Sequence, residues 1–291
     1  SQIKKPFQKG KSPWPICLDT VTISPASLED KIKIAAKAGY DAIEPWDGEL
    51  EKYEKDGGNL KDLGKKIKDS GLFVPSVIGL WDCLPTSKEA WEASLPATRN
   101  RMRMAAAIGA QHVQAIPGHW SKDASQHKDW DYKWAADRFR DLLEIGLNEY
   151  NINPALVFVN FLPAVRRIGQ AAAVAIDANH PKAKIIPDVY HMYIADSGFD
   201  GLKLLNGDII GIFQFNDAPA TPSKDQLKDE HRVYPGDGIL PLPKILKDLY
   251  GIGYRGCISL ELYNPNYYKE NLQKVAETGL QKTLEVISKA I

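Results

Sequence analysis

The sequence predicts a single α/β barrel of eight strand–helix units, and three observations support this prediction. Amphipathic helical stretches that end near Gly or Asn alternate with short apolar strands along the 291 residues. The strands are continuously apolar, which is typical of strands buried on both faces of a parallel sheet. A barrel takes about 250 residues, so the chain has room for one. We therefore expect one (β/α)8 domain over residues 1–291, with residues 1–13 as an N-terminal extension.

The alternation runs through the chain in order. Each clear helical stretch is followed by a Gly or Asn, which suits the positive φ of the position after a helix. An open, doubly wound sheet is the main alternative, but residues 19–22 lack the Gly-rich loop that usually follows its first strand. Expected helices cover residues 28–38, 60–70, 99–108, 134–150 and 245–252, and expected strands cover 16–18, 41–44, 72–77, 112–116, 155–159, 184–186, 209–213 and 256–261.

Composition excludes several classes of partner. Lys plus Arg equals Asp plus Glu at 37 each, so a nucleic-acid partner is not expected. No apolar run reaches the roughly 18 residues that span a bilayer, and residues 1–12 lack the apolar segment of a signal peptide. The widely spaced Cys17, Cys83 and Cys257 predict free thiols and a cytoplasmic location, with Cys17 and Cys257 in the core.

Oxygen-bearing side chains end three consecutive expected strands near the C-terminus. Asp188, Gln214 and Glu261 each follow an apolar run. Strand C-termini of a parallel barrel converge on one rim, so these side chains are expected to meet. Carboxylate and amide oxygens suit a hard divalent cation. His191 lies three residues after Asp188 and can bind a metal or a substrate hydroxyl, although an N-cap Asp and a packed His would also explain the pair.

Further candidates lie on expected rim segments. Glu44 ends the second strand shortly before Trp46, and it could bind substrate hydroxyls or form an ion pair at the rim. Arg232 enters a rigid turn at 234–238 that could hold it over the rim. The loop segments 78–86 and 117–129 carry Trp81, His119 and Trp120, and these tryptophans either pack locally or line a pocket.

These residues resemble the xylose-isomerase-like TIM-barrel family of sugar isomerases and epimerases over nearly the whole chain. The matching segments are 42–46 (AIEPW), 187–191 (PDVYH), 213–217 (FQFND), Arg232 with 235–238 (PGDG), and 258–261 (ISLE). The resemblance implies a site for Mn²⁺, Mg²⁺ or a similar ion, held by Glu, Asp, His or Gln, and Glu. Three of these ligands map onto Asp188, Gln214 and Glu261. The first Glu maps onto Val157, which has no donor atom.

The resemblance implies a metal-dependent isomerase or epimerase that acts on a sugar or keto-sugar through an enediolate. Glu261 would move the proton, and His191 and Arg232 would hold substrate oxygens. Glu44, Trp46 and His119 would complete the substrate site. In isomerising and epimerising relatives both glutamates exchange the substrate proton, so Val157 removes one partner.

Two other interpretations of the sequence stay open. One is a metal-dependent lyase or dehydratase acting on a keto-sugar or inositol derivative, in which one acid/base residue could suffice. The other is a catalytically weakened sugar-binding protein. In each case the expected partner is a small-molecule sugar, and assembly into a homo-oligomer is left open.

Overall fold

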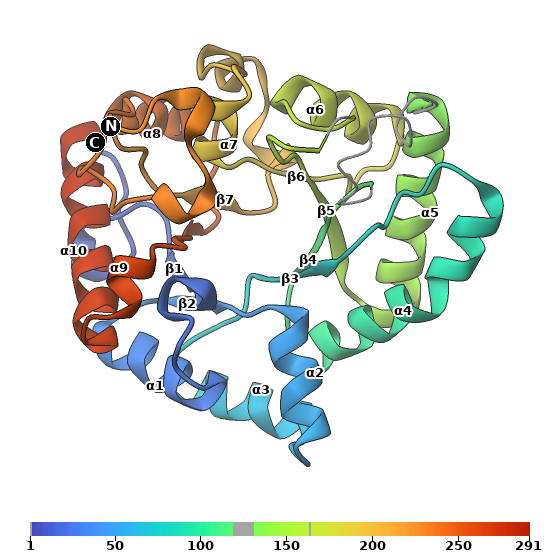
Figure 1. The fold of residues 1–291 in the computed structure, drawn as a ribbon, viewed down its shortest axis with the longest axis horizontal. Coiled ribbons are helices and arrows are strands. Elements are labelled where there is room, and N and C mark those ends of the chain that lie inside the picture. The colour runs from blue at the N-terminus through green and yellow to red at the C-terminus, as the bar shows by residue number, and fades with distance from the viewer. Residues whose placement is uncertain (1, 119–130, 163) are drawn as a thin grey trace.

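The structure is a computed structural model that describes residues 2–118, 131–162 and 164–291, and it confirms the barrel. Figure 1 shows the strands at the centre of the molecule with the helices arranged as a ring around them. The strands are β1 (Ile16–Asp19), β2 (Ala42–Glu44), β3 (Ser76–Leu80), β4 (His112–Ala115), β5 (Asn153–Val157), β6 (Ile185–Ile186), β7 (Phe213–Phe215) and β8 (Ile258–Leu260). The helices are α1 (Leu28–Ala38), α2 (Asp47–Lys55), α3 (Leu60–Asp69), α4 (Lys88–Ala107), α5 (Tyr132–Tyr150), α6 (Ile168–Asp177), α7 (Val189–Ile194), α8 (Leu242–Gly251), α9 (Pro265–Tyr268) and α10 (Leu272–Ala290).

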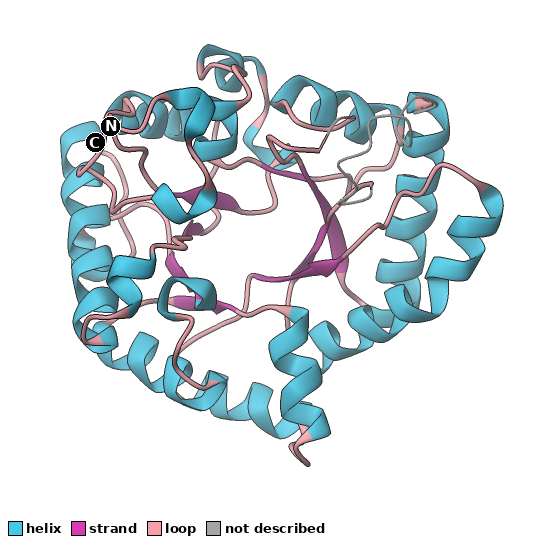
Figure 2. Cartoon of the chain, in the orientation of Figure 1, coloured by secondary structure: helices cyan, strands magenta, loops and turns pink. Residues whose placement is uncertain are grey.

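The eight strands form two parallel four-stranded sheets that face each other across the barrel (Figure 2). One sheet has the order β2-β1-β8-β7 and the other the order β3-β4-β5-β6. Two isolated bridges join them on each side: Ala42–Phe73 and Trp46–Ile78 on one side, and Ile185–Ile210 and Asp188–Gln214 on the other. All strand C-termini therefore point to the same rim, as parallel pairing requires.

Burial divides the core into two layers. The larger layer fills the space between the strands and the surrounding helices. The smaller one occupies the barrel interior and includes Cys17, Ala155, Val157 and Cys257. The cysteines are free and buried, which confirms Cys17 and Cys257 as core residues. None of the described helices is both long enough and apolar enough to cross a membrane.

Two expected strands are displaced toward their C-termini. The third was expected at residues 72–77 but runs over Ser76–Leu80, because Pro75 has no N–H to donate to the ladder. The seventh was expected at residues 209–213 but runs over Phe213–Phe215. Its apolar run begins in a 3₁₀ turn, Gly207–Ile209, where the Asn206 side chain accepts from the Asp208 backbone N–H.

Helix ends follow the capping residues of the sequence. The Ser27 hydroxyl accepts from the Asp30 N–H at the start of α1, and Gly39 ends that helix with φ at 98°, as the sequence predicts. The expected helix at 99–108 is the C-terminal half of α4, which begins at Lys88 after the Ser87 cap and continues through Pro96.

A buried carboxylate organises the loop that carries Arg232. The two oxygens of Asp217 accept hydrogen bonds from the backbone N–H groups of Ala218, Gly236, Gly238 and Leu240, at 2.9–3.1 Å. Asp217 also pairs with Val233 through the backbone. The 234–238 turn is therefore tied to the end of β7, which sets where Arg232 enters the barrel.

We expect Asp217→Ala to lower the free energy of unfolding by about 3 kcal/mol, because four N–H groups lose a charged acceptor. Asp237→Ala, in the same turn, removes only a partly exposed ion pair with Lys282 and should cost less than about 1 kcal/mol. Urea denaturation of both variants measures the difference. Equal losses would show that Asp217 does not anchor the turn.

Candidate active site

A cavity opens at the C-terminal rim of the strands. It encloses about 500 Å³ of space, including solvent at its mouth. Its acidic and imidazole lining consists of Asp188, Asp229, Glu261 and His191. The remaining lining residues are Trp46, Ile78, Trp81, Gln114, Ile116, Val157, Phe158, Val159, Phe161, Ile186, Gln214 and Tyr263. The three predicted ligands Asp188, Gln214 and Glu261 therefore do share one cavity.

Asp188 caps helix α7 and is fully engaged by donors. Its Oδ1 accepts from the backbone N–H groups of Tyr190 and His191, at 2.8 and 3.2 Å, and from the Asn216 side chain at 3.3 Å. Its Oδ2 accepts from Arg232 Nη1 at 3.0 Å. The residue thus has the N-cap role that the sequence allowed, and both of its oxygens have partners.

Arg232 lies beneath the cavity, and its side chain is completely buried. The guanidinium donates to Asp188, to Asp229 at 2.8 Å and to Glu261 at 3.4 Å. The rings of Tyr190 and Tyr263 lie 4.9 Å from its central carbon. This placement makes Arg232 the counter-charge of three carboxylates, whereas the substrate contact expected from the sequence would require an exposed guanidinium.

His191 borders the cavity and also contacts Arg232. Its Nε2 lies 3.2 Å from Arg232 Nη2, and its Nδ1 lies 3.3 Å from the backbone N–H of Asn160. Burial lowers the pKa of His191, and Arg232 lowers it further against the opposing effect of Asp188. The imidazole is therefore neutral at pH 7, and because a neutral ring has one acceptor nitrogen, it accepts from either Arg232 or Asn160 but not from both.

Glu44 is buried in the barrel below the cavity, so the direct substrate contact considered for it is not seen. Its oxygens accept hydrogen bonds from Gln114 and Gln214, both at 2.8 Å, and from Ser259 at 2.9 Å. Gln214 uses its amide nitrogen for this bond, and its Oε1 is buried without a hydrogen-bond partner. A buried carbonyl oxygen without a partner is uncommon and indicates an unfilled contact.

Glu261 follows β8 and faces the cavity. Burial raises the pKa of its carboxyl to about 7, with Arg232 opposing the rise and Asp188 and Glu44 adding to it. The Tyr263 hydroxyl donates to its Oε1 at 2.6 Å, and Arg232 Nη1 donates to the same oxygen at 3.4 Å. A carboxyl with a pKa near 7 can both take up and release a proton at neutral pH.

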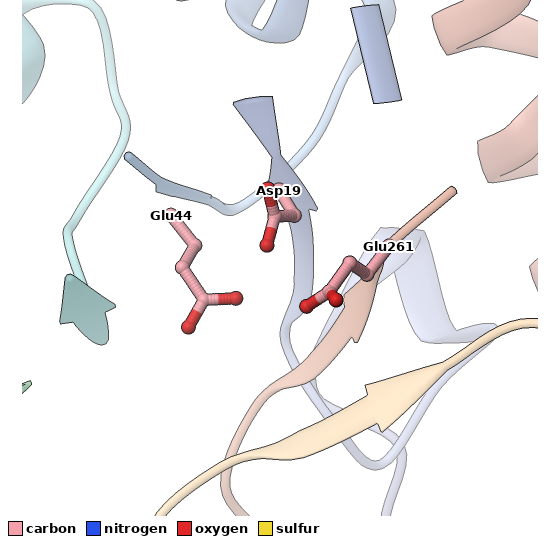
Figure 3. A group of neighbouring side chains, drawn as sticks. All are labelled: Asp19, Glu44 and Glu261. Atoms are coloured by element: carbon pink, nitrogen blue, oxygen red, sulfur yellow. The ribbon is translucent and has the colours of Figure 1, made fainter. Parts of the chain in front are cut away.

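The structure adds Asp19, which was not among the residues expected at the site. Oxygens of Asp19, Glu44 and Glu261 all lie within 4.8 Å of one another, and Figure 3 shows the three side chains converging from neighbouring strands. Burial raises the pKa of Asp19, to which Glu261 and Glu44 also contribute. The signal was present in the sequence, since Asp19 ends the first apolar strand as Glu44 and Glu261 end theirs.

Aromatic rings form one side of the cavity. The Trp46 ring lies 5.8 Å from that of Trp81 and 6.2 Å from that of Tyr263. Trp46 Nε1 also donates to Asp19 Oδ1 at 2.9 Å. Trp81, for which pocket lining and local packing were the two alternatives, lines the cavity together with Trp46 and also donates to Asp47 Oδ1 at 2.9 Å. His119 and Trp120 lie outside the described residues.

Some residues at the rim fit a divalent cation, and others do not. Val157 lines the cavity at the end of β5 and offers no ligand, and Asp188 is already engaged. Asp19 Oδ2 and Gln214 Oε1, by contrast, are buried oxygens without hydrogen-bond partners. Unpaired oxygens of this kind are the donors that a hard cation takes.

Comparison with known proteins identifies the family. The sequence profile of the xylose isomerase-like TIM barrel family matches residues 32–289. This chain belongs to that family.

Individual relatives agree with this assignment. An inosose isomerase of Bacillus velezensis is 26% identical over 93% of this chain and 96% of its own length. A 3-dehydroshikimate dehydratase of Pseudomonas putida is 22% identical over 91% of this chain but only 40% of its own length. A crystal structure of the IOLI protein with a bound zinc atom superposes with a TM-score of 0.83 at 24% identity, covering 95% of this chain and 99% of that one.

We expect Arg232→Met to lower the free energy of unfolding by about 3–5 kcal/mol, because it leaves buried carboxylates without their counter-charge. Arg103→Met is the matched control, since Arg103 pairs with Glu54 on the surface and should contribute less than about 1 kcal/mol. Chemical denaturation in metal-free buffer compares them. Similar losses would contradict a special role for the buried guanidinium.

Proposed function

We propose that this protein is an isomerase that interconverts an uncharged keto-sugar or inosose-like polyol by moving a proton between adjacent carbon atoms. The observation that supports this most directly is Glu261. Its carboxyl lines the cavity, and Tyr263 and Arg232 both donate to Oε1, which leaves Oε2 for a substrate. The full-length similarity to inosose isomerases supports the same reaction class.

Glu261 would remove the proton from the carbon next to the substrate carbonyl and return it to the neighbouring carbon. The enediolate formed between these steps gains negative charge, which a cavity lined by acidic groups does not stabilise alone. The Tyr263 hydroxyl and Arg232 hold Glu261 Oε1. This fixes the orientation of the carboxyl while Oε2 transfers the proton.

A single base suits transfer on one face of the substrate. Epimerisation through opposite faces needs a second acid or base, and Val157 cannot supply one at the end of β5. We therefore favour isomerisation over epimerisation. His191 Nε2 faces Arg232, so His191 would accept a hydrogen bond from substrate only if that contact were broken. We therefore assign His191 a positioning role.

A divalent cation would polarise the substrate carbonyl and stabilise the developing negative charge when bound. Glu261 belongs both to the predicted ligand set Asp188–Gln214–Glu261 and to the group of neighbouring carboxylates Asp19, Glu44 and Glu261. Mn²⁺ or Mg²⁺ is the ion we propose, on the basis of the oxygen donors.

Charge also restricts the substrate. Among the described residues that line the cavity, the charged side chains are acidic, and Arg232 is buried beneath them. Phosphate or carboxylate groups would be repelled. The tryptophan and tyrosine rings offer apolar faces that suit the C–H faces of a sugar ring. An uncharged polyol is therefore favoured over a sugar phosphate.

The proposal is tested by incubating the purified protein with inososes and keto-sugars in D₂O plus Mn²⁺, and following deuterium uptake by NMR. We expect exchange at the carbon next to the carbonyl and formation of an isomer. Glu261→Gln should reduce kcat by at least about 100-fold, because proton transfer by a positioned group contributes that much.

Glu277→Gln is the matched control, because Glu277 is an exposed residue of α10, and it should leave kcat unchanged. Circular dichroism confirms folding of both variants. If no substrate of the panel exchanges deuterium with any of Mn²⁺, Mg²⁺ or Zn²⁺, the isomerase proposal fails.

A dehydratase is the second candidate, because one base suffices for elimination and a dehydratase is among the relatives. Mass spectrometry of the product distinguishes the two reactions. An isomer has the mass of the substrate, whereas elimination lowers the mass by one water.

A further inference from the structure

Three buried carboxylates meet on one of the two sheets. Asp19 is directly paired with Glu44 in the β1–β2 register, and Leu18 is paired with Leu260, which brings Glu261 beside Asp19. The three therefore stand at one level on the adjacent strands β2, β1 and β8. Figure 3 shows an oxygen of Asp19 directed toward the space between the other two carboxylates.

The negative charge of this group is poorly compensated. Within the described parts of the chain, no Lys, Arg or His side chain forms an ion pair with Asp19 or Glu44. Glu44 accepts only from amide and hydroxyl groups, and Asp19 Oδ1 accepts from the Val21 and Trp46 N–H groups. Carboxylates this close repel one another unless a cation or protons lie between them.

An independent observation comes from β7. Gln214 is 3% exposed, and its amide group contacts this cluster because Nε2 donates to Glu44 Oε1 at 2.8 Å. Its Oε1 has no hydrogen-bond partner, and neither has Asp19 Oδ2. Two buried, unpaired oxygens at one acidic cluster indicate a missing electropositive ligand.

The opposite side of the rim also has a buried oxygen without a partner, Asn216 Oδ1, but it differs in charge because Arg232 lies among its carboxylates. Both oxygens of Asp188 have donors, one of them the permanently charged Arg232. Val157, paired with Ile186 on β5 and β6, has no donor atom. The carboxylates near Asp188 already have their cation in the protein itself.

We propose that a divalent cation binds between Asp19, Glu44 and Glu261, with the Gln214 side-chain carbonyl as fourth ligand, on the β2-β1-β8-β7 sheet. Three carboxylates and an amide oxygen select a hard ion such as Mn²⁺ or Mg²⁺. A site on this sheet does not need a ligand at Val157. The inference rests on the proposed function only in that the ion would assist the same reaction at Glu261.

The test is titration of the metal-free protein with Mn²⁺, followed by the loss of the free Mn²⁺ signal in electron paramagnetic resonance. Wild type should bind one ion per chain. Asp19→Asn should weaken binding at least about tenfold through loss of ligand charge, and Glu44→Gln should do the same. Asp188→Asn should change the affinity less than about threefold.

A stability measurement separates loss of a ligand from damage to the fold. Asp19 Oδ2 meets no donor, so the amide of Asp19→Asn creates no clash and removes like-charge repulsion. The unfolding midpoint of the metal-free variant should equal or exceed that of wild type. Thermal stabilisation by Mn²⁺ should be largely lost.

Wild-type affinity in both Asp19→Asn and Glu44→Gln, or absence of Mn²⁺ binding by wild type, would overturn the site. Loss of binding in Asp188→Asn with retention in Asp19→Asn would place the ion on the other half of the rim and also overturn it. Neither result depends on turnover. Conversely, tight Mn²⁺ binding with the predicted variant pattern but no deuterium exchange would reject the proposed isomerase reaction and leave the metal site standing.

Discussion

The buried guanidinium of Arg232 is the contact on which the arrangement of the site depends. It pairs with Asp188 and Asp229, holds Glu261 through Oε1 and contacts the His191 ring. Asp217 makes this possible, since its four backbone hydrogen bonds tie the Arg232 loop to the end of β7. Burying a cation among several carboxylates is favourable only because the charges are mutually paired and the donors have acceptors.

The same contact divides the acidic residues of the rim into two groups. On the side of Asp188 the protein supplies its own cation. On the side of Asp19 and Glu44 it supplies none among the described residues, and oxygens remain without partners. Glu261 lies between the groups and contacts both. Its raised pKa follows from that position, because burial and neighbouring carboxylates outweigh Arg232. Because Glu261 lies between the two groups, it is the carboxyl that we propose to transfer the proton.

Much of this could be read from the sequence. Apolar runs that each end in Asp, Gln or Glu identified the rim, because parallel strands bring their C-termini together whatever their detailed register. The C-terminal end of α1 follows from Gly39, whose positive φ ends the helix. Asp19 obeys the same strand-end rule, because it ends the first apolar strand.

Other features required coordinates. Sequence spacing cannot show that Arg232 turns inward to carboxylates, because that direction is set by the Asp217 hydrogen bonds across the loop. It also cannot show which oxygens lack partners, as for Gln214. Strands β3 and β7 begin later than their apolar runs because of Pro75 and the turn after Asn206. Apolar composition alone does not predict these starting points.

The position of the cation can be measured directly by anomalous diffraction from crystals soaked in Mn²⁺, with data collected on both sides of the manganese absorption edge. We predict one peak per chain, contacted by Asp19, Glu44, Glu261 and the carbonyl of Gln214, with Arg232 still paired to Asp188. A peak contacted by Asp188 and remote from Asp19, or no peak at millimolar Mn²⁺, would contradict this division of the rim.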